Sequence, residues 1–228
     1  MTSVLKSPYT SEQMAVWIRG LLMVAWADGN FDAEEQKLIS SLTQNEVAPK
    51  TDLGSLEPIT ADELAAAFKQ DARGAEDFLR TAVMVAVADG VYSSSEDELL
   101  FQFCQALGQQ PKALLLLRQT LIPTPESEIS SDSDKGVAAR IRQRDVLRPV
   151  RVWLDGLEIH DPRLARFLCK MIPSQCPFER DVKLFGHKIV HIPPLCKLNP
   201  IYEQLVGLRF RALSYLADDC GEDVSPYC

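Results

Sequence analysis

The stretches MVAWADGNFDAEEQKLI (residues 23–39) and MVAVADGVYSSSEDELL (residues 84–100) align with each other without a gap. Both begin with Met-Val-Ala and have Ala-Asp-Gly at the centre. Both also carry a Glu seven residues after the Asp and a Leu three residues beyond that Glu. In each copy we expect an apolar helix to end at the Gly and a second helix to begin after a short acidic loop. The repeat therefore predicts a pseudo-symmetric helical module in the N-terminal half of the chain.

Signals for helix starts around the repeat support this prediction. Asp32 with Glu35, and Ser93 with Glu96, have the spacing of a capping box, in which two side chains satisfy each other's backbone N–H groups. Thr60 begins a third box of this kind. Together with the apolar spacing, these signals predict helices over residues 11–27, 60–70, 75–88, 95–107 and 111–121. Residues 1–122 are thus expected to form an acidic helical bundle.

A change in composition after this bundle predicts a domain boundary. Residues 123–136 (PTPESEISSDSDKG) hold almost nothing that a core could use, and we interpret them as a polar linker. Residues 137–228 are then expected to form a small helical domain, in which Asp161 and Pro162 begin one helix. Residues 181–192 contain a Gly-His pair between short apolar stretches, so a β-hairpin is a candidate there. The fold class expected for the whole chain is mainly α.

Charge is distributed unevenly along the chain. The net charge of −8 divides into −11 over residues 1–139 and +3 over residues 140–228. An acidic N-terminal half argues against nucleic-acid binding, which needs clustered Lys and Arg. No apolar run reaches the roughly 18 residues that cross a bilayer, and the first residues lack the apolar stretch of a signal peptide. We therefore expect a cytoplasmic protein with no transmembrane segment, for which peripheral membrane association and the oligomeric state stay open.

Residues 11–121 resemble the tellurite-resistance TerB-like family. The resemblance rests on the duplicated Ala-Asp-Gly units with their following Glu, on the acidic charge and on the helical pattern. Members of this family are helical bundles associated with membrane-linked stress or metal-response systems. The resemblance implies a binding or scaffold role rather than catalysis.

The C-terminal half is similar to the family named Mo-dependent nitrogenase C-terminus, known mostly from cyanobacterial proteins. The resemblance is carried by WLDGLEIHDPRLARFLCKMIPSQCPFERD (residues 153–181), HIPPLCKLNP (residues 191–200) and YEQLVGLRFRALSYLADDCGED (residues 202–223). A nitrogenase requires large subunits that hold metal clusters, and this chain has 228 residues. The resemblance is therefore taken to imply the family, but no catalytic activity and no catalytic residue.

One candidate metal site consists of carboxylates in the two repeats. Asp28 and Glu35 would meet Asp89 and Glu96 if the two copies pack about a pseudo-two-fold axis. Hard divalent cations such as Ca²⁺ prefer such clusters of oxygen ligands. The competing interpretation is that Glu35 and Glu96 cap helices and need no ion.

A second candidate metal site lies in the C-terminal half, where Cys169, Cys176, His191 and Cys196 are suitable ligands for zinc or an iron–sulfur cluster. No close Cys-x-x-Cys pair is present, and Cys169 is equally explained as a buried thiol on an apolar helix. Cys196 with His191 could also form a catalytic pair, but we find no third group to orient them. The sequence therefore favours a protein that is not an enzyme.

The run ALLLL (residues 113–117) has two interpretations. It could be a partner-binding or membrane-surface face, although its two basic neighbours are too few for strong attraction to anionic lipid. A buried helix explains the run more simply. The chain as a whole is expected to be a non-enzymatic adapter or regulatory protein with a protein partner, acting in stress, metal or photosynthetic-membrane physiology. The alternative is a small metalloprotein that holds zinc or an iron–sulfur cluster through C-terminal Cys and His residues.

Overall fold

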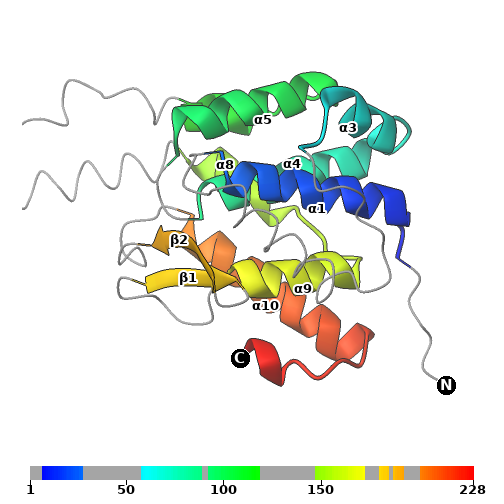
Figure 1. The fold of residues 1–228 in the computed structure, drawn as a ribbon, viewed down its shortest axis with the longest axis vertical. Helices are drawn as coiled ribbons and strands as arrows, with labels where there is room; N and C mark the ends of the chain where they lie inside the picture. Colours follow the sequence, from blue (N-terminus) through cyan, green and yellow to red (C-terminus); the bar gives the residue numbers. More distant parts are fainter. Residues whose placement is uncertain are drawn as a thin grey trace, which may run out of the picture.

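Helices dominate the computed structural model of the chain, as the sequence predicts (Figure 1). The structure describes residues 7–27, 58–88, 92–118, 147–172, 180–184, 187–192 and 201–228. The N-terminal half contains α1 (Ser11–Ala25), α3 (Ala61–Phe68), α4 (Ala72–Ala86), α5 (Ser94–Ala106) and α6 (Lys112–Arg118). The C-terminal half contains α8 (Arg148–Asp155), α9 (Pro162–Met171), β1 (Arg180–Leu184), β2 (His187–Ile192), α10 (Tyr202–Ser214), the π-helical turn η3 (Tyr215–Asp219) and the 3-10 turn η4 (Ser225–Tyr227). The mainly α fold class is confirmed.

The two strands form one antiparallel pair within the segment where the sequence suggested a hairpin. Arg180 lies opposite Ile192, and Leu184 lies opposite His187. The register shifts between Val182 and Lys183, which makes the pairing irregular at its centre. In Figure 1 the pair lies beside α9, which contacts β1.

Capping boxes begin three helices of the N-terminal half. In each box the first side chain accepts a hydrogen bond from the backbone N–H three residues later, and the later side chain returns the contact. The boxes are Thr10 with Gln13 at α1, Thr60 with Glu63 at α3, and Ser93 with Glu96 at α5. A side-chain cap of this kind stabilises a helix by about 1 kcal/mol. The boxes of α3 and α5 are those predicted from the sequence.

In the second copy of the repeat one helix is followed by another, as predicted, but α4 ends at Ala86, before the Gly90 at which the sequence placed its end, and α5 begins at Ser94. In the first copy α1 ends at Ala25, and residues 28–39 lie outside the described part of the chain. The pseudo-symmetry of the two copies therefore stays a prediction. The proposed linker, residues 123–136, also lies outside the described residues.

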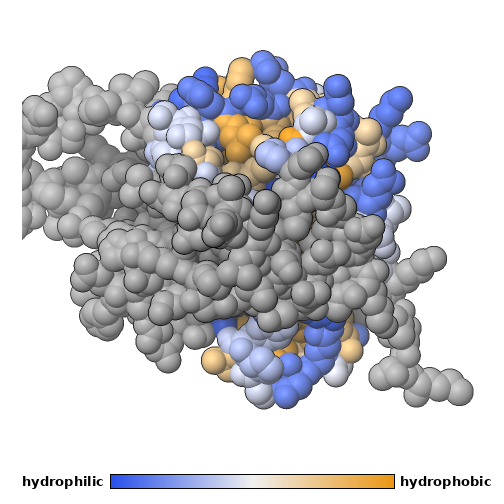
Figure 2. Space-filling model, in the orientation of Figure 1, coloured by the Kyte–Doolittle hydropathy of each residue, from blue (hydrophilic) through white to orange (hydrophobic). Residues whose placement is uncertain are grey.

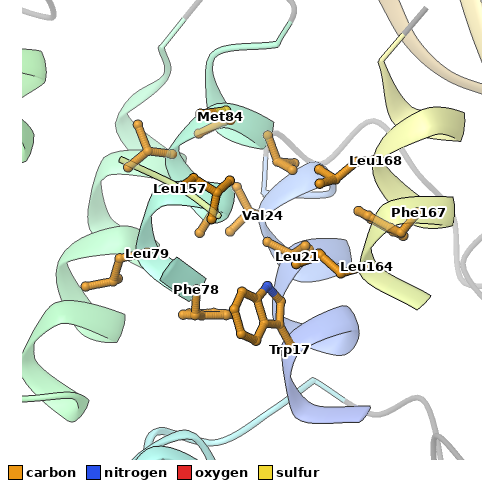
Figure 3. Close-up of a cluster of buried hydrophobic side chains, with 14 of the residues drawn as sticks. Trp17, Leu21, Val24, Phe78, Leu79, Met84, Leu157, Leu164, Phe167 and Leu168 are labelled. Atoms are coloured by element: carbon orange, nitrogen blue, oxygen red, sulfur yellow. The ribbon is translucent and has the colours of Figure 1, made fainter. Parts of the chain in front are cut away.

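One hydrophobic core extends through both halves of the described chain. Helix α1 contacts α4 on one side and α9 on the other. Figure 3 shows Leu21 of α1 between Phe78 of α4 and Leu164 of α9. All three side chains are fully or almost fully buried. The sequence left contact between the halves undetermined, and the structure shows that they pack against each other.

Polar contacts join α4 to α8 at the edge of this core. Arg80 Nε donates a hydrogen bond to the carbonyl oxygen of Trp153 at 2.8 Å, and Trp153 Nε1 donates to a Glu76 carboxylate oxygen at 2.9 Å. The Arg80 guanidinium also lies over the indole ring, 5.6 Å from its centroid. A Cβ at Gly156 would lie 3.0 Å from Arg80 Nη2, so the glycine leaves room for the guanidinium. These contacts hold the C-terminal half at a fixed place on α4.

Asp161 forms a second polar link between the halves. Its buried carboxylate caps α9 by accepting a hydrogen bond from Arg163 N at 2.7 Å, and it also accepts one from Ser7 Oγ. Arg163 Nη2 donates to the same carboxylate at 2.7 Å. Burial opposes ionisation of Asp161, but the hydrogen bonds from Arg163 and Ser7 and the guanidinium charge outweigh it and hold the pKa of Asp161 below its usual value. The ionised carboxylate thus ties the segment before α1 to the start of α9.

Candidate functional site

The acidic residues of the repeats are only partly within the described chain. Glu96 lies in the first turn of α5, where its carboxylate accepts hydrogen bonds from Ser93 N and Ser93 Oγ, both at 2.7 Å. This is the capping role that competed with ion binding in the sequence. Asp28, Glu35 and Asp89 lie outside the described residues. The divalent-cation site therefore stays a prediction.

The Cys and His residues of the C-terminal half are also only partly described. Cys169 is buried in α9, and burial raises the pKa of its thiol to about 11. His191 lies on β2 opposite Asp181, whereas Cys176 and Cys196 lie outside the described residues. Across the described ranges, no three His, Cys, Asp or Glu side chains gather so that they could hold a metal ion. The zinc or iron–sulfur site stays a prediction, and we derive no chemical step through such a group.

Exposed apolar side chains on α5 and α6 indicate a third candidate site. Phe101 of α5 is 47% exposed, and Leu115 of α6 is 61% exposed. Figure 2 shows, over α5 at the top of the view, hydrophobic residues open to the surface between hydrophilic ones. Ala113 and Leu117 of the ALLLL run are buried, as the buried-helix interpretation expects. That interpretation is wrong for Leu115, because a helix packed on one side leaves its opposite face in solvent.

A pocket of about 170 Å³ opens between α5 and α6, with Phe101 and Leu115 at its edge. Its wall is largely apolar. The residues that line it are Phe101, Cys104, Pro111, Leu114 and Leu115, with Asp97, Gln109, Gln110 and Arg118 as the polar members. Exposed aromatic and aliphatic side chains and an apolar pocket therefore occur together at this place.

A tight turn shapes this pocket by setting the corner between the two helices. Gly108 adopts a φ of +62°, a left-handed conformation that glycine reaches without strain. Its N–H donates to the carbonyl of Gln105 at 3.2 Å, and Gln109 N donates to the carbonyl of Cys104 at 2.9 Å. This pair of hydrogen bonds is the Schellman pattern that ends α5. Pro111 follows and precedes the first turn of α6.

A chain of contacts runs from the core to the exposed ring of Phe101. The buried Tyr92 hydroxyl donates to Asp97 Oδ1 at 3.0 Å, and Arg118 Nε donates to Asp97 Oδ2 at 2.7 Å. The Arg118 guanidinium lies over the Phe101 ring, 5.2 Å from its centroid. Burial and the neighbouring Asp97 carboxylate raise the pKa of Tyr92 above its usual value, so its hydroxyl stays a donor. The ring is therefore exposed but held in place.

The thiol in the pocket wall is in an environment that disfavours its nucleophilic form. Cys104 is buried, and burial raises the pKa of its thiol to about 12. The thiolate is the reactive form of cysteine, and here it is strongly disfavoured. The pocket thus offers apolar contact and a few polar groups at its edge, and it holds no activated nucleophile among its lining residues.

Cysteine labelling tests this picture of inert, buried thiols. At pH 8 we expect iodoacetamide to modify the exposed Cys228 readily and to leave Cys104 and Cys169 unmodified in the folded protein. A thiol whose pKa is about 12 is ionised to only ~0.01% at that pH. Mass spectrometry of peptides after timed labelling gives the order, and the same reaction in 6–8 M urea, about the range that unfolds small proteins, is the control. Rapid modification of Cys104 in the native state would show that the pocket thiol is accessible and ionised.

Sequence reasoning assigned no role in a site to Phe101, Arg118 or Tyr92. One signal was available in the helical register of α5, where the buried apolar residues are Leu100, Phe103 and Cys104. Phe101 falls outside this apolar face, and an aromatic residue out of phase with the core is a candidate for surface recognition. The pairing of Arg118 with Asp97 joins two helices across a turn, and no spacing rule within one helix predicts it.

Comparison with known proteins identifies one segment of the chain. Residues 146–228 match the family model described as Mo-dependent nitrogenase C-terminus. This segment contains α8, α9, both strands, α10 and the two C-terminal turns, and the match confirms the resemblance seen in this part of the sequence. No curated protein and no solved structure gave a significant match to the chain. The pocket between α5 and α6 lies outside the matched segment.

Among the residues that the structure describes, no helix combines the length and the apolar character needed to cross a bilayer.

Proposed function

We propose that this chain is a non-enzymatic adapter that binds a protein partner at the apolar pocket between α5 and α6. The observation that carries the proposal is the preformed pocket of about 170 Å³ with exposed Phe101 and Leu115 at its edge. Aromatic residues and Arg are enriched at protein interfaces, where a few side chains in well-packed pockets carry most of the binding energy. Phe101 and Arg118 are of these types, and Leu115 adds exposed apolar surface beside them.

A protein partner fits this site better than a small ligand does. A cavity of about 150 Å³ accepts one benzene ring, so this pocket takes a single side chain of similar size. Phe101 and Leu115 keep large parts of their surfaces outside the pocket, and a ligand that only filled it would leave them in water. A partner chain would cover them and exclude water around the inserted side chain.

The two family resemblances support the same type of function. The resemblance of residues 11–121 to the TerB-like family supports a binding or scaffold role. The similarity of the C-terminal half to a family known mostly from cyanobacterial proteins supports a role in stress, metal or photosynthetic-membrane physiology. We propose a cytoplasmic location for the adapter, with the C-terminal half packed on the bundle that carries the pocket.

Site-specific photocrosslinking tests the adapter proposal. With p-benzoylphenylalanine in place of Leu115, we expect irradiation of native cells to yield a crosslinked partner protein. The same photoreactive residue in place of Phe210, which is 70% exposed on α10, is the matched control and should not yield that product. The captured protein is then purified and its affinity for the full chain is measured directly.

The direct measurement decides the question, because capture alone can be adventitious. We expect Leu115→Asp to weaken binding of the purified partner at least about tenfold, which corresponds to about 1.4 kcal/mol, and Phe210→Asp to leave it unchanged. Equal affinity for both variants, or no specific crosslink at position 115, would contradict the proposal.

A further inference from the structure

We infer that the pocket between α5 and α6 receives an aromatic ring from a neutral segment of the partner, and that Tyr92, Asp97 and Arg118 position Phe101 to receive it. The inference rests on the proposed adapter function and adds the chemistry of the partner's anchor. It follows from the size of the pocket, the charge at its edge and the contacts that fix the Phe101 ring.

The size and lining of the pocket favour an unsubstituted aromatic ring. About 170 Å³ is slightly more than the cavity that accepts benzene, and it is too small for a long acyl chain. Cys104, Pro111 and Leu114 provide apolar wall atoms on the inner side. The exposed Phe101 ring at the edge can pair edge-to-face with an inserted ring, an arrangement that aromatic pairs prefer.

Charge near the pocket is balanced, although the N-terminal half as a whole is acidic. Arg118 pairs with Asp97 at 2.7 Å. The exposed Lys112 lies three residues before Leu115 on α6, and the exposed Glu98 lies three residues before Phe101 on α5. One ion pair thus lines the pocket, and one basic and one acidic residue lie about one helical turn from its exposed apolar side chains. A neutral partner segment matches this surface, and its binding should depend little on salt.

The contacts that fix the Phe101 side chain reduce the conformational entropy that is lost when a partner binds. An exposed side chain loses conformational freedom when a partner orders it, and a side chain that is already ordered avoids that cost. The Asp97 carboxylate pairs with Nε and Nη2 of Arg118, and the planar guanidinium in turn stacks on the Phe101 ring. The Tyr92 hydroxyl fixes the other oxygen of Asp97. Lysine at position 118 would keep the charge but lose the planar group that both pairs and stacks.

Two capped amino acids serve as probes for the full-length protein. N-acetyl-phenylalaninamide and N-acetyl-leucinamide are both neutral and differ in the side chain alone. In ¹⁵N-correlation NMR titrations we expect the phenylalanine probe to shift the signals of residues 97–118 and to bind about fivefold more tightly than the leucine probe. Raising NaCl from about 50 mM to about 500 mM should change its dissociation constant by less than about twofold.

Two variants test the role of Arg118 in positioning the Phe101 ring and the role of the pocket itself, with folding checked separately. Arg118→Lys should weaken the phenylalanine probe about threefold while the leucine probe binds as before, because only the aromatic pair depends on the fixed ring. Leu114→Trp should block both probes by filling the pocket, with native melting temperature as the check that it folds. If that variant is unstable, Phe101→Leu replaces it and should make the affinities of the two probes equal.

The outcomes distinguish this inference from the adapter proposal. Equal binding of the two probes, shifts that map away from α5 and α6, or equal weakening of both probes by Arg118→Lys would overturn the inference. If neither probe binds while Leu115→Asp still weakens binding of the purified partner at least about tenfold, the adapter role stands and the aromatic anchor is refuted. If neither probe binds and Leu115→Asp leaves the affinity for the purified partner unchanged, both the aromatic anchor and the adapter role are refuted.

Discussion

Leu164→Ala is expected to lower the free energy of unfolding by about 2–5 kcal/mol and to destabilise both halves of the chain together. Leu164 is almost completely buried on α9, where it faces Leu21 of α1 (Figure 3). Truncation removes apolar contacts and leaves a cavity at the contact between the two halves. Because one core joins them, hydrogen exchange in α1 and α4 should accelerate along with exchange in α9 and α10.

Hydrogen exchange followed by mass spectrometry measures this effect, and chemical unfolding gives the change in free energy. Leu115→Ala removes the same atoms from an exposed position and should cost less than about 1 kcal/mol. Faster exchange restricted to α9 and α10 would show that the halves fold as separate units despite their contact.

Asp161→Ala is expected to cost about 3–5 kcal/mol at pH 7. The substitution removes the cap of α9 and leaves the Arg163 guanidinium, itself largely buried, without its closest carboxylate. It also releases Ser7, which donates to the same carboxylate. Urea unfolding at pH 7 measures the loss, and Asp223→Ala, at an exposed residue, is the control.

The contribution of Asp161 should depend on pH in a defined direction. Its pKa in the folded protein lies below the usual Asp value of about 3.9, so the unfolded chain takes up a proton at higher pH than the folded chain does. The stabilisation is thus complete above pH ~4 to 5 and is lost as the pH falls through the lower pKa of the folded state. The stability difference between the wild type and Asp161→Asn should shrink over that acid range. A constant difference from pH 7 down to pH 2, roughly two units below the usual Asp pKa, would contradict this assignment.

Local sequence signals predicted the helix boundaries well where a single side chain decides them. Thr60, Ser93 and Asp161 cap α3, α5 and α9 as their spacing indicated. In the last helix the spacing of the apolar residues predicts one buried face, and the structure buries all five of them: Ile201, Leu205, Leu208, Ala212 and Leu216. Gly221 adopts the left-handed conformation expected beyond a helix end, with a φ of +67°.

Long-range contacts were not predictable from the same signals. The stacking of Arg80 on Trp153 and the burial of Asp161 against Ser7 join residues more than 70 positions apart, and no local periodicity encodes such pairs. The candidate site was predicted only in part, because the sequence offered a partner-binding face as one interpretation of the ALLLL run but favoured a buried helix. The ALLLL run reads as uniformly apolar, but the packing of α6 on one side alone leaves Leu115 outside.

The shared core has a consequence for protein turnover in the cell. A ligand that binds only the folded state stabilises every part of a cooperative unit, including parts that it does not touch. Helix α6 forms one side of the pocket and also contacts α8, the first helix of the segment that matches the nitrogenase-related family model. A partner held between α5 and α6 would therefore slow proteolytic degradation of the distant C-terminal segment, so that the abundance of the whole chain follows the abundance of its partner.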